Sequence, residues 1–229
     1  GKKYYGPVPM YFALKNSLNA ATSALGISVG VGKVIETARK LGVKSKLEAV
    51  PSALLGSFEL YPMDVIEAYV TIARMGSHIP LTTIRSIADS QGQVLLKPTN
   101  DAEQVIDSHK VASLVSMMKQ TVQSGTARAI TAQGFSVPAA GKTGTTSDNR
   151  DAWFAGFTKE KTTIAWVGLD TPTANGLTGA SGAVPIWLRY MQKITEPQLG
   201  DFDWPEGLHP EIKTGVDPEQ PDQEIELIF

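Results

Sequence analysis

The spacing of hydrophobic residues changes once along this chain, near residue 135, and that change constrains the fold more than any other feature. Before it, apolar residues recur at helical intervals, as in Gly32–Leu41, where they share one face. After it come three segments with strand character, Val137–Thr143, Asp151–Thr158 and Thr162–Leu169. The predicted fold class is α/β, of the α+β type, with an antiparallel sheet sandwiched by helices.

The connections between these strands support the antiparallel arrangement. Thr146–Arg150 and Lys159–Lys161 are short enough for hairpins. Gly176–Gly182 is expected to be a glycine-rich loop. The other helices are expected at Met10–Asn16, Pro62–Gly76, Ser108–Ser124 and Val184–Ile194, with a hairpin at Thr82–Lys97. In the helix that begins at Pro62, the side chains expected to point inward are Val65, Ile66, Tyr69 and Ala73.

Charge divides the chain into two parts. Residues 196–229 contain ten acidic residues, one lysine and five prolines. We therefore expect residues 1–195 to form the folded body and residues 196–229 to wrap along it or to be partly disordered. The body then has 13 acidic and 20 basic residues, a balance that favours an anionic substrate.

Composition also excludes several classes of function. The chain has no cysteine, so disulfides and thiolate metal sites are excluded, and its three histidines are not at metal-ligand spacings. We expect no metal and no cofactor. No basic run with interleaved aromatic residues indicates nucleic acid, and no apolar run approaches the length of a membrane span. We expect neither nucleic-acid binding nor membrane contact from this chain.

The run Lys142-Thr143-Gly144-Thr145-Thr146 is the first candidate site. On a strand Thr143 and Thr145 point the same way, so their hydroxyls can bind one carboxylate. Gly144 lets a ligand backbone come close, as an added strand would, and Lys142 adds a positive charge. The Thr145 N–H can point at a developing oxyanion. The alternative is a polar edge strand without catalytic function.

A second candidate is Ser17-Leu18-Asn19, between two helical segments. The serine can relay a proton and the asparagine can bind a substrate amide, although a helix cap is the simpler interpretation. Ser-x-Asn followed by Lys-Thr-Gly is the pattern of penicillin-binding proteins and serine β-lactamases. The stretches GKTGTTSDNRDAWFAGFT, IAWVGLD and GASGAVPIW together resemble the transpeptidase domain of class A penicillin-binding proteins.

This resemblance implies a peptidoglycan D,D-transpeptidase that cross-links stem peptides through an acyl-serine and is inhibited by β-lactams. Ser17, Asn19 and Lys142 would be catalytic, and Thr143, Gly144, Thr145 and Thr146 would bind substrate. It also implies a glycosyltransferase in the parent protein and a location in the periplasm or on the outer face of the cytoplasmic membrane, with an anchor outside this chain. The alternatives are a D,D-carboxypeptidase and a non-catalytic module that binds β-lactams, muropeptides or partners.

The family also needs a nucleophile in a Ser-x-x-Lys motif that precedes Ser-x-Asn. Only 16 residues precede Ser17, and none is a serine. The full match Ser116-Met117-Met118-Lys119 lies after Ser-x-Asn in a predicted helix, where the helical period points Ser116 away from the buried face. We interpret it as a solvated helix position. The nucleophile is expected on an upstream segment of the same protein, or on a separate chain, so that this chain alone is inactive.

Overall fold

The structure is a computed structural model that describes residues 4–99, 101–171 and 173–228. An antiparallel sheet runs through its centre in the order β5 (Ala140–Thr145), β6 (Ala152–Phe157) and β7 (Thr162–Val167). The three predicted strands are confirmed, with bounds that shift by at most three residues at their ends.

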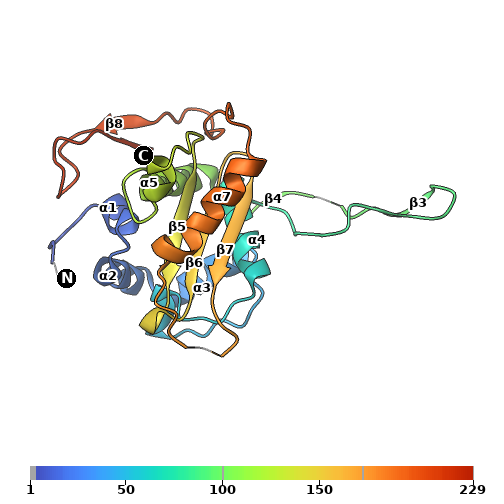
Figure 1. Cartoon of the computed structure of the whole chain (residues 1–229), viewed down its shortest axis with the longest axis horizontal. Helices are drawn as coiled ribbons and strands as arrows, with labels where there is room; N and C mark the ends of the chain where they lie inside the picture. The colour runs from blue at the N-terminus through green and yellow to red at the C-terminus, as the bar shows by residue number, and fades with distance from the viewer. Residues whose placement is uncertain (1–3, 100, 172, 229) are drawn as a thin grey trace.

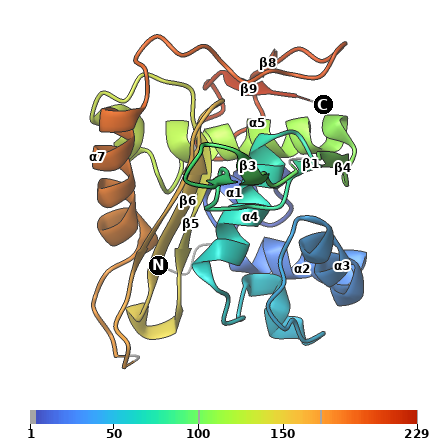
Figure 2. The same cartoon turned by 90° about the vertical axis from the view of Figure 1, so that its right-hand side faces the viewer.

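Helices cover both faces of this sheet (Figures 1 and 2). On one face lies α7 (Val184–Ile194), whose fully buried Trp187 meets Phe154 of β6 edge to face, with ring centroids 5.2 Å apart. The short α6 (Ala129–Ala132) packs on the same cluster. On the other face, Phe157 packs against α4 (Pro62–Ala73) and α5 (Ser108–Gln123). The predicted sandwich is confirmed.

Three helices at the start of the chain lead into this sandwich. The first, α1 (Met10–Lys15), buries Tyr11 and Phe12, whereas α2 (Asn19–Val29) has no fully buried residue. The helix predicted at Gly32–Leu41 is α3 (Val31–Lys40), and a 3₁₀ turn, η1 (Pro51–Leu55), follows it. No helix within the described ranges combines the length and the apolar character that crossing a membrane requires.

The buried face of α4 agrees only in part with the predicted one. Tyr69 and Ala73 are half-buried and pack on the cluster around Phe157, as predicted. Val65 and Ile66 are also only half-buried, whereas the carboxylates of Asp64 and Glu67 lie inside. Glu67 accepts hydrogen bonds from Lys44 (3.1 Å) and pairs with His78 (2.8 Å), and Asp64 accepts one from the Ser45 backbone N–H (2.6 Å). The prediction missed these two carboxylates because nearby polar groups satisfy them, which hydropathy alone cannot show.

A long arm projects from the body between α4 and α5 (Figure 1). Its base is the pair β1 (Ser77–His78) and β4 (Glu103–Gln104). Farther out, β2 (Ile87–Ala88) and β3 (Val94–Leu96) form the predicted hairpin, although its paired part is much shorter than Thr82–Lys97.

The acidic tail lies across the top of the molecule, above α5 (Figure 2). It contains a small hairpin of β8 (Glu211–Lys213) and β9 (Ile225–Leu227). Ile225 and Leu227 are buried against Tyr11 and Phe12 of α1. Lys15 of α1 also forms a buried ion pair with Asp217. Burial alone would raise the pKa of the Asp217 carboxyl. Hydrogen bonds, of which the one from Lys15 has the largest effect, and the charge of Lys15 outweigh burial and lower this pKa below its usual value.

Two irregular segments border β5. The turn between β5 and β6 includes η2 (Ser147–Asn149), where Asp148 and Asn149 have positive φ angles of 60° and 51°. The predicted glycine-rich loop ends in η3 (Gly179–Ala183), a π-helical turn whose start is held by a capping box between Thr178 and Ser181. This turn brings the backbone of Gly179 against β5.

Candidate active site

Ser17 occupies a tight turn between α1 and α2. Its φ angle is 54°, in the left-handed region that non-glycine residues seldom adopt. The turn is held by backbone hydrogen bonds from the Ser17 N–H to Leu14 and from the Leu18 N–H to Ala13. Such strain persists only where the surroundings maintain it, and here it leaves an exposed Ser17 hydroxyl facing β5.

Lys142 on β5 is the partner of this hydroxyl. Its ammonium group donates to Ser17 Oγ at 2.8 Å and to the Thr143 carbonyl at 2.8 Å. Burial lowers the pKa of Lys142 to about 8, because the charged form loses hydration. An amine with this pKa is partly neutral near physiological pH, so it can accept a proton from Ser17 or return one to it. The structure therefore brings together two residues that are 125 positions apart.

Asn19 is the first residue of α2 and is exposed. Within the ranges that the structure describes, its side chain makes no hydrogen bond, so its amide is available to a ligand. Only Leu18 separates Asn19 from Ser17, so both residues lie at the N-terminal end of α2.

The edge of β5 that faces away from β6 has no strand partner among the described residues. The Thr146 N–H points toward β6, where it donates to the Asp151 carbonyl at 3.1 Å. Successive N–H groups of a strand alternate between its two edges, so the Thr145 N–H points to the open edge. An added ligand strand would meet this donor.

The two threonine hydroxyls of the motif lie on one face of β5, and each has a neighbour. Thr143 Oγ1 is 2.7 Å from Thr126 Oγ1, and Thr145 Oγ1 accepts a hydrogen bond from the Gly179 N–H at 3.0 Å. Because the Thr145 hydroxyl oxygen accepts this hydrogen bond, its hydrogen remains free to be donated to a carboxylate.

Gly144 and Thr146 have different surroundings. A side chain at Gly144 would come within 3.2 Å of Trp153 Cβ. Thr146 lies at the turn, where its hydroxyl accepts from the Asp151 N–H at 2.8 Å and donates to the Asp151 carboxylate at 3.2 Å. These bonds hold the end of β5 in place, and they occupy a hydroxyl that was predicted to bind substrate.

Sequence reasoning gave too little weight to Thr126 and Gly179, which both touch the Lys-Thr-Gly strand. A Cβ on Gly179 would lie 2.7 Å from the Gly144 carbonyl and 2.5 Å from the Trp153 carbonyl, so only glycine fits there. The sequence signals were the Gly125-Thr126 pair after a long helix and the glycines of Gly179–Gly182. Neither signal indicates which strand these residues approach.

The Ser116–Lys119 pair requires a correction. It was predicted to be solvated, but Ser116 and Lys119 are only 2% and 6% exposed. Ser116 Oγ donates to the Ser113 carbonyl and accepts from the Ile228 N–H, and Lys119 bonds to Asp201 and Glu226 at 2.9 Å. The acidic tail covers this face of α5. Ser116 is therefore engaged and shielded, which excludes it as a nucleophile for a different reason than the predicted one.

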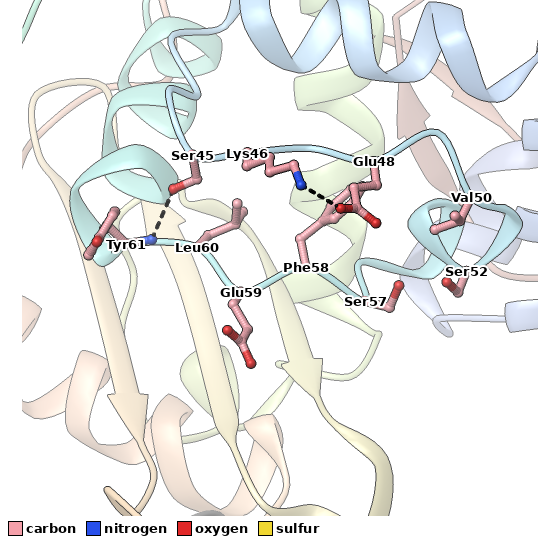
Figure 3. Close-up of a pocket in the computed structure, with 10 residues that line it drawn as sticks. All are labelled: Ser45, Lys46, Glu48, Val50, Ser52, Ser57, Phe58, Glu59, Leu60 and Tyr61. Atoms are coloured by element: carbon pink, nitrogen blue, oxygen red, sulfur yellow. Dashed lines mark hydrogen bonds and ion pairs between the residues drawn. The ribbon is translucent and has the colours of Figure 1, made fainter.

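One cavity, of about 640 Å³, lies between the segments Ser45–Glu48 and Ser57–Tyr61 (Figure 3). Lys46 and Glu48 form an ion pair of 2.8 Å across its edge. None of the predicted site residues lines it. The described residues also contain no cluster of histidine and carboxylate side chains that could hold a metal ion.

Comparison with known proteins identifies the family. The family described as penicillin binding protein transpeptidase domain matches residues 2–192. Penicillin-binding protein 1B of Vibrio cholerae is 42% identical over 90% of this chain, and penicillin-binding protein 1B of Escherichia coli is 40% identical over 85%. The chain spans only 27% and 23% of those two proteins.

Solved structures show the same fold. Penicillin-binding protein 1A from Haemophilus influenzae superposes with a TM-score of 0.84 at 21% identity, over 99% of this chain and 40% of that one. PonA1 from Mycobacterium tuberculosis in complex with penicillin V has a TM-score of 0.73 at 23% identity, over 86% of this chain and 58% of that one. With its Ser-x-Asn turn facing a Lys-Thr-Gly strand, this chain belongs to the transpeptidase domain family of class A penicillin-binding proteins.

Proposed function

We propose that this chain is the C-terminal part of a serine-type peptidoglycan D,D-transpeptidase, with residues 1–195 as domain body and residues 196–229 as its tail. The observation that carries the proposal is the 2.8 Å contact between Lys142 and Ser17 beside the open edge of β5. Acyl transfer to and from a bound peptide requires two things: a pair of side chains that can relay protons, and a strand edge along which the peptide can bind. Ser17 and Lys142 supply the first, and the open edge of β5 supplies the second.

The reaction divides into two steps. A serine attacks the carbonyl of the terminal D-Ala-D-Ala bond, and D-alanine leaves with a proton on its nitrogen. The amine of a second stem peptide then attacks the acyl-serine, and the serine oxygen recovers its proton. Ser17 and Lys142 exchange these protons, since a lysine with a pKa of about 8 is present in both forms near neutral pH.

The remaining residues hold the donor peptide. The hydroxyls of Thr143 and Thr145 bind its terminal carboxylate, and Asn19 binds a substrate amide. The Thr145 N–H, on the open edge, forms half of an oxyanion hole. The same arrangement would accept β-lactams, which carry a carboxylate beside a reactive amide.

The nucleophile itself lies outside these 229 residues in this proposal. No Ser-x-x-Lys precedes Ser17, and the Ser116 match is buried under the tail. The relatives are roughly four times longer than the matched region. We infer that another segment of the parent protein, or a separate chain, supplies the serine, so that the isolated chain is inactive. The parent would also carry a glycosyltransferase and a membrane anchor and act in the periplasm or on the outer face of the cytoplasmic membrane.

The test is the acylation rate of the full-length parent protein with benzylpenicillin. Lys142→Ala should slow acylation at least about a hundredfold, because it removes the proton acceptor. Lys161→Ala, which removes an exposed lysine from the turn after β6, is the matched control and should retain the rate. A Lys142→Ala protein that acylates normally would exclude this mechanism and would favour a non-catalytic module. Release of D-alanine without cross-linked product would favour the D,D-carboxypeptidase.

A further inference from the structure

A second cavity, of about 650 Å³, is lined by the end of α5, by the turn and short helix that follow it and, from η3, by Ala180. Thr126 belongs to its wall, and the hydroxyl of Thr126 is 2.7 Å from that of Thr143. Ala180 follows Gly179, whose N–H bonds to Thr145. Two segments of the cavity wall, at Thr126 and at Ala180, therefore lie beside the two hydroxyls assigned above to the carboxylate of the departing D-alanine.

The lining of this cavity is mixed. Ala129, Ala132 and Ala180 contribute methyl groups, and the polar lining residues are Gln123, Thr126, Arg128 and Thr131. Arg128 is exposed, and within the described ranges its guanidinium group forms no hydrogen bond and no ion pair. A guanidinium free of protein partners at the wall of a cavity is suited to bind a carboxylate of a ligand that enters it.

The second step of the proposed reaction determines which ligand could reach this position. By microscopic reversibility, the attacking amine enters along the path by which the D-alanine amine left. The substituents of that amine therefore extend toward Thr143 and Thr145, as D-alanine did. An acceptor peptide is larger than alanine, and the cavity whose wall includes Thr126, the hydrogen-bond partner of Thr143, offers room for its additional atoms.

We propose that the cavity beside Thr126 is the subsite for the amine-bearing acceptor peptide. In this proposal Arg128 selects acceptors that carry a carboxylate in addition to the one that Thr143 and Thr145 bind. This inference rests on the proposed transpeptidase function. In the step itself, the acceptor nitrogen forms a bond to the acyl carbon, the ester bond to the serine oxygen breaks, and the proton lost by the nitrogen passes to that oxygen. Arg128 takes no part in the proton transfer; it positions the acceptor and determines its specificity.

The experiment compares two acceptors that differ in charge but not in shape. Full-length protein is acylated with a thioester donor, and the acyl-enzyme is partitioned between D-glutamate and D-glutamine. The readout is the ratio of the two aminolysis products, which cancels any common change in acylation. We expect wild-type protein to favour D-glutamate about tenfold, the effect of one charge-assisted hydrogen bond, and Arg128→Gln to bring the ratio close to one.

Two further variants make this outcome specific. Arg128→Lys keeps the charge without the planar fork and should retain part of the preference. Arg85→Gln removes an exposed arginine from the projecting arm and should retain all of it. Equal use of both acceptors by wild-type protein, or an unchanged ratio in Arg128→Gln, would overturn the proposal. A wild-type protein that is not acylated by benzylpenicillin would instead refute the transpeptidase function, so the two failures are distinguishable.

Discussion

Replacing Gly125 by alanine is a direct test of how the two halves of the candidate active site are held together. Gly125 follows the C-cap of α5, Ser124, and touches the backbone of α1, where the Thr126 N–H donates to the Lys15 carbonyl at 3.1 Å. A Cβ on Gly125 would lie 2.5 Å from that carbonyl oxygen and 2.8 Å from Thr121 Cα. Both neighbours are backbone atoms, so no side-chain rotation can relieve the contact.

The size of the effect follows from this geometry. Ordinary contacts of a Cβ begin near 3.4 Å, so the backbones of α1 and α5 must separate by about 0.9 Å. Overpacking of this kind costs about 1–3 kcal/mol of folding stability. Ser17 follows Lys15 by two residues and depends on the same turn. A shift of about 1 Å in a reacting group lowers rates about a hundredfold, which is about 2.7 kcal/mol of activation free energy.

The assay is the acylation of full-length protein by a fluorescent penicillin, measured as both rate constant and final amplitude. A displaced Ser17 lowers the rate constant, whereas a fraction of unfolded protein lowers only the amplitude. Gly200→Ala is the control, because no atom lies within 4 Å of the Cβ position there. A Gly125→Ala protein with full amplitude and a rate constant within twofold of wild type would refute the reasoning.

Two other predictions concern the proton relay and the tail. Because burial lowers the pKa of Lys142 to about 8, the acylation rate should rise about tenfold from pH 7 to pH 9, and Lys142→Arg should remove this rise. Folding stability should also increase as pH rises from about 8 to the ordinary lysine pKa, because in this range Lys142 has lost its proton in the folded chain but keeps it in the unfolded chain. Urea titrations at several pH values would show whether the free energy of unfolding rises in this range. Ile225→Ala should cost about 2–5 kcal/mol and release the tail to proteases, because Ile225 is fully buried, whereas Ile212→Ala in the same hairpin, 63% exposed, should leave the tail protected.

Elements that depend on local sequence patterns were predictable. The helix Val184–Ile194 matches its prediction at both ends, because one apolar stripe continues through it and a proline lies in its first turn. The three strands and their antiparallel order follow from short connections and period-two patterns. The proximity of Ser17 and Lys142 was available only through the family resemblance, since nothing local links two residues 125 positions apart.

The features that were predicted wrongly or given too little weight depend on contacts between distant segments. Ser116 and Lys119 lie on the side of α5 that its apolar stripe marks as outward, yet the tail returns and covers them. The buried carboxylate of Glu67 is stable because Lys44 and His78 supply its partners. A helical period reports which side of a helix is apolar, but it cannot report what another segment places against the polar side.

The position of the tail has a consequence for the order in which the domain can form. Tyr11 and Phe12 complete their buried cluster only with Ile225 and Leu227, and Lys15 finds its buried partner 202 residues later. A chain that emerges from its N-terminus therefore cannot close this cluster until residues 217–227 have been made. Because the Ser17 turn follows α1 directly, we expect the two halves of the active site to align last. A nascent chain that has not yet reached this segment, or a chain truncated before it, would then remain unreactive toward β-lactams.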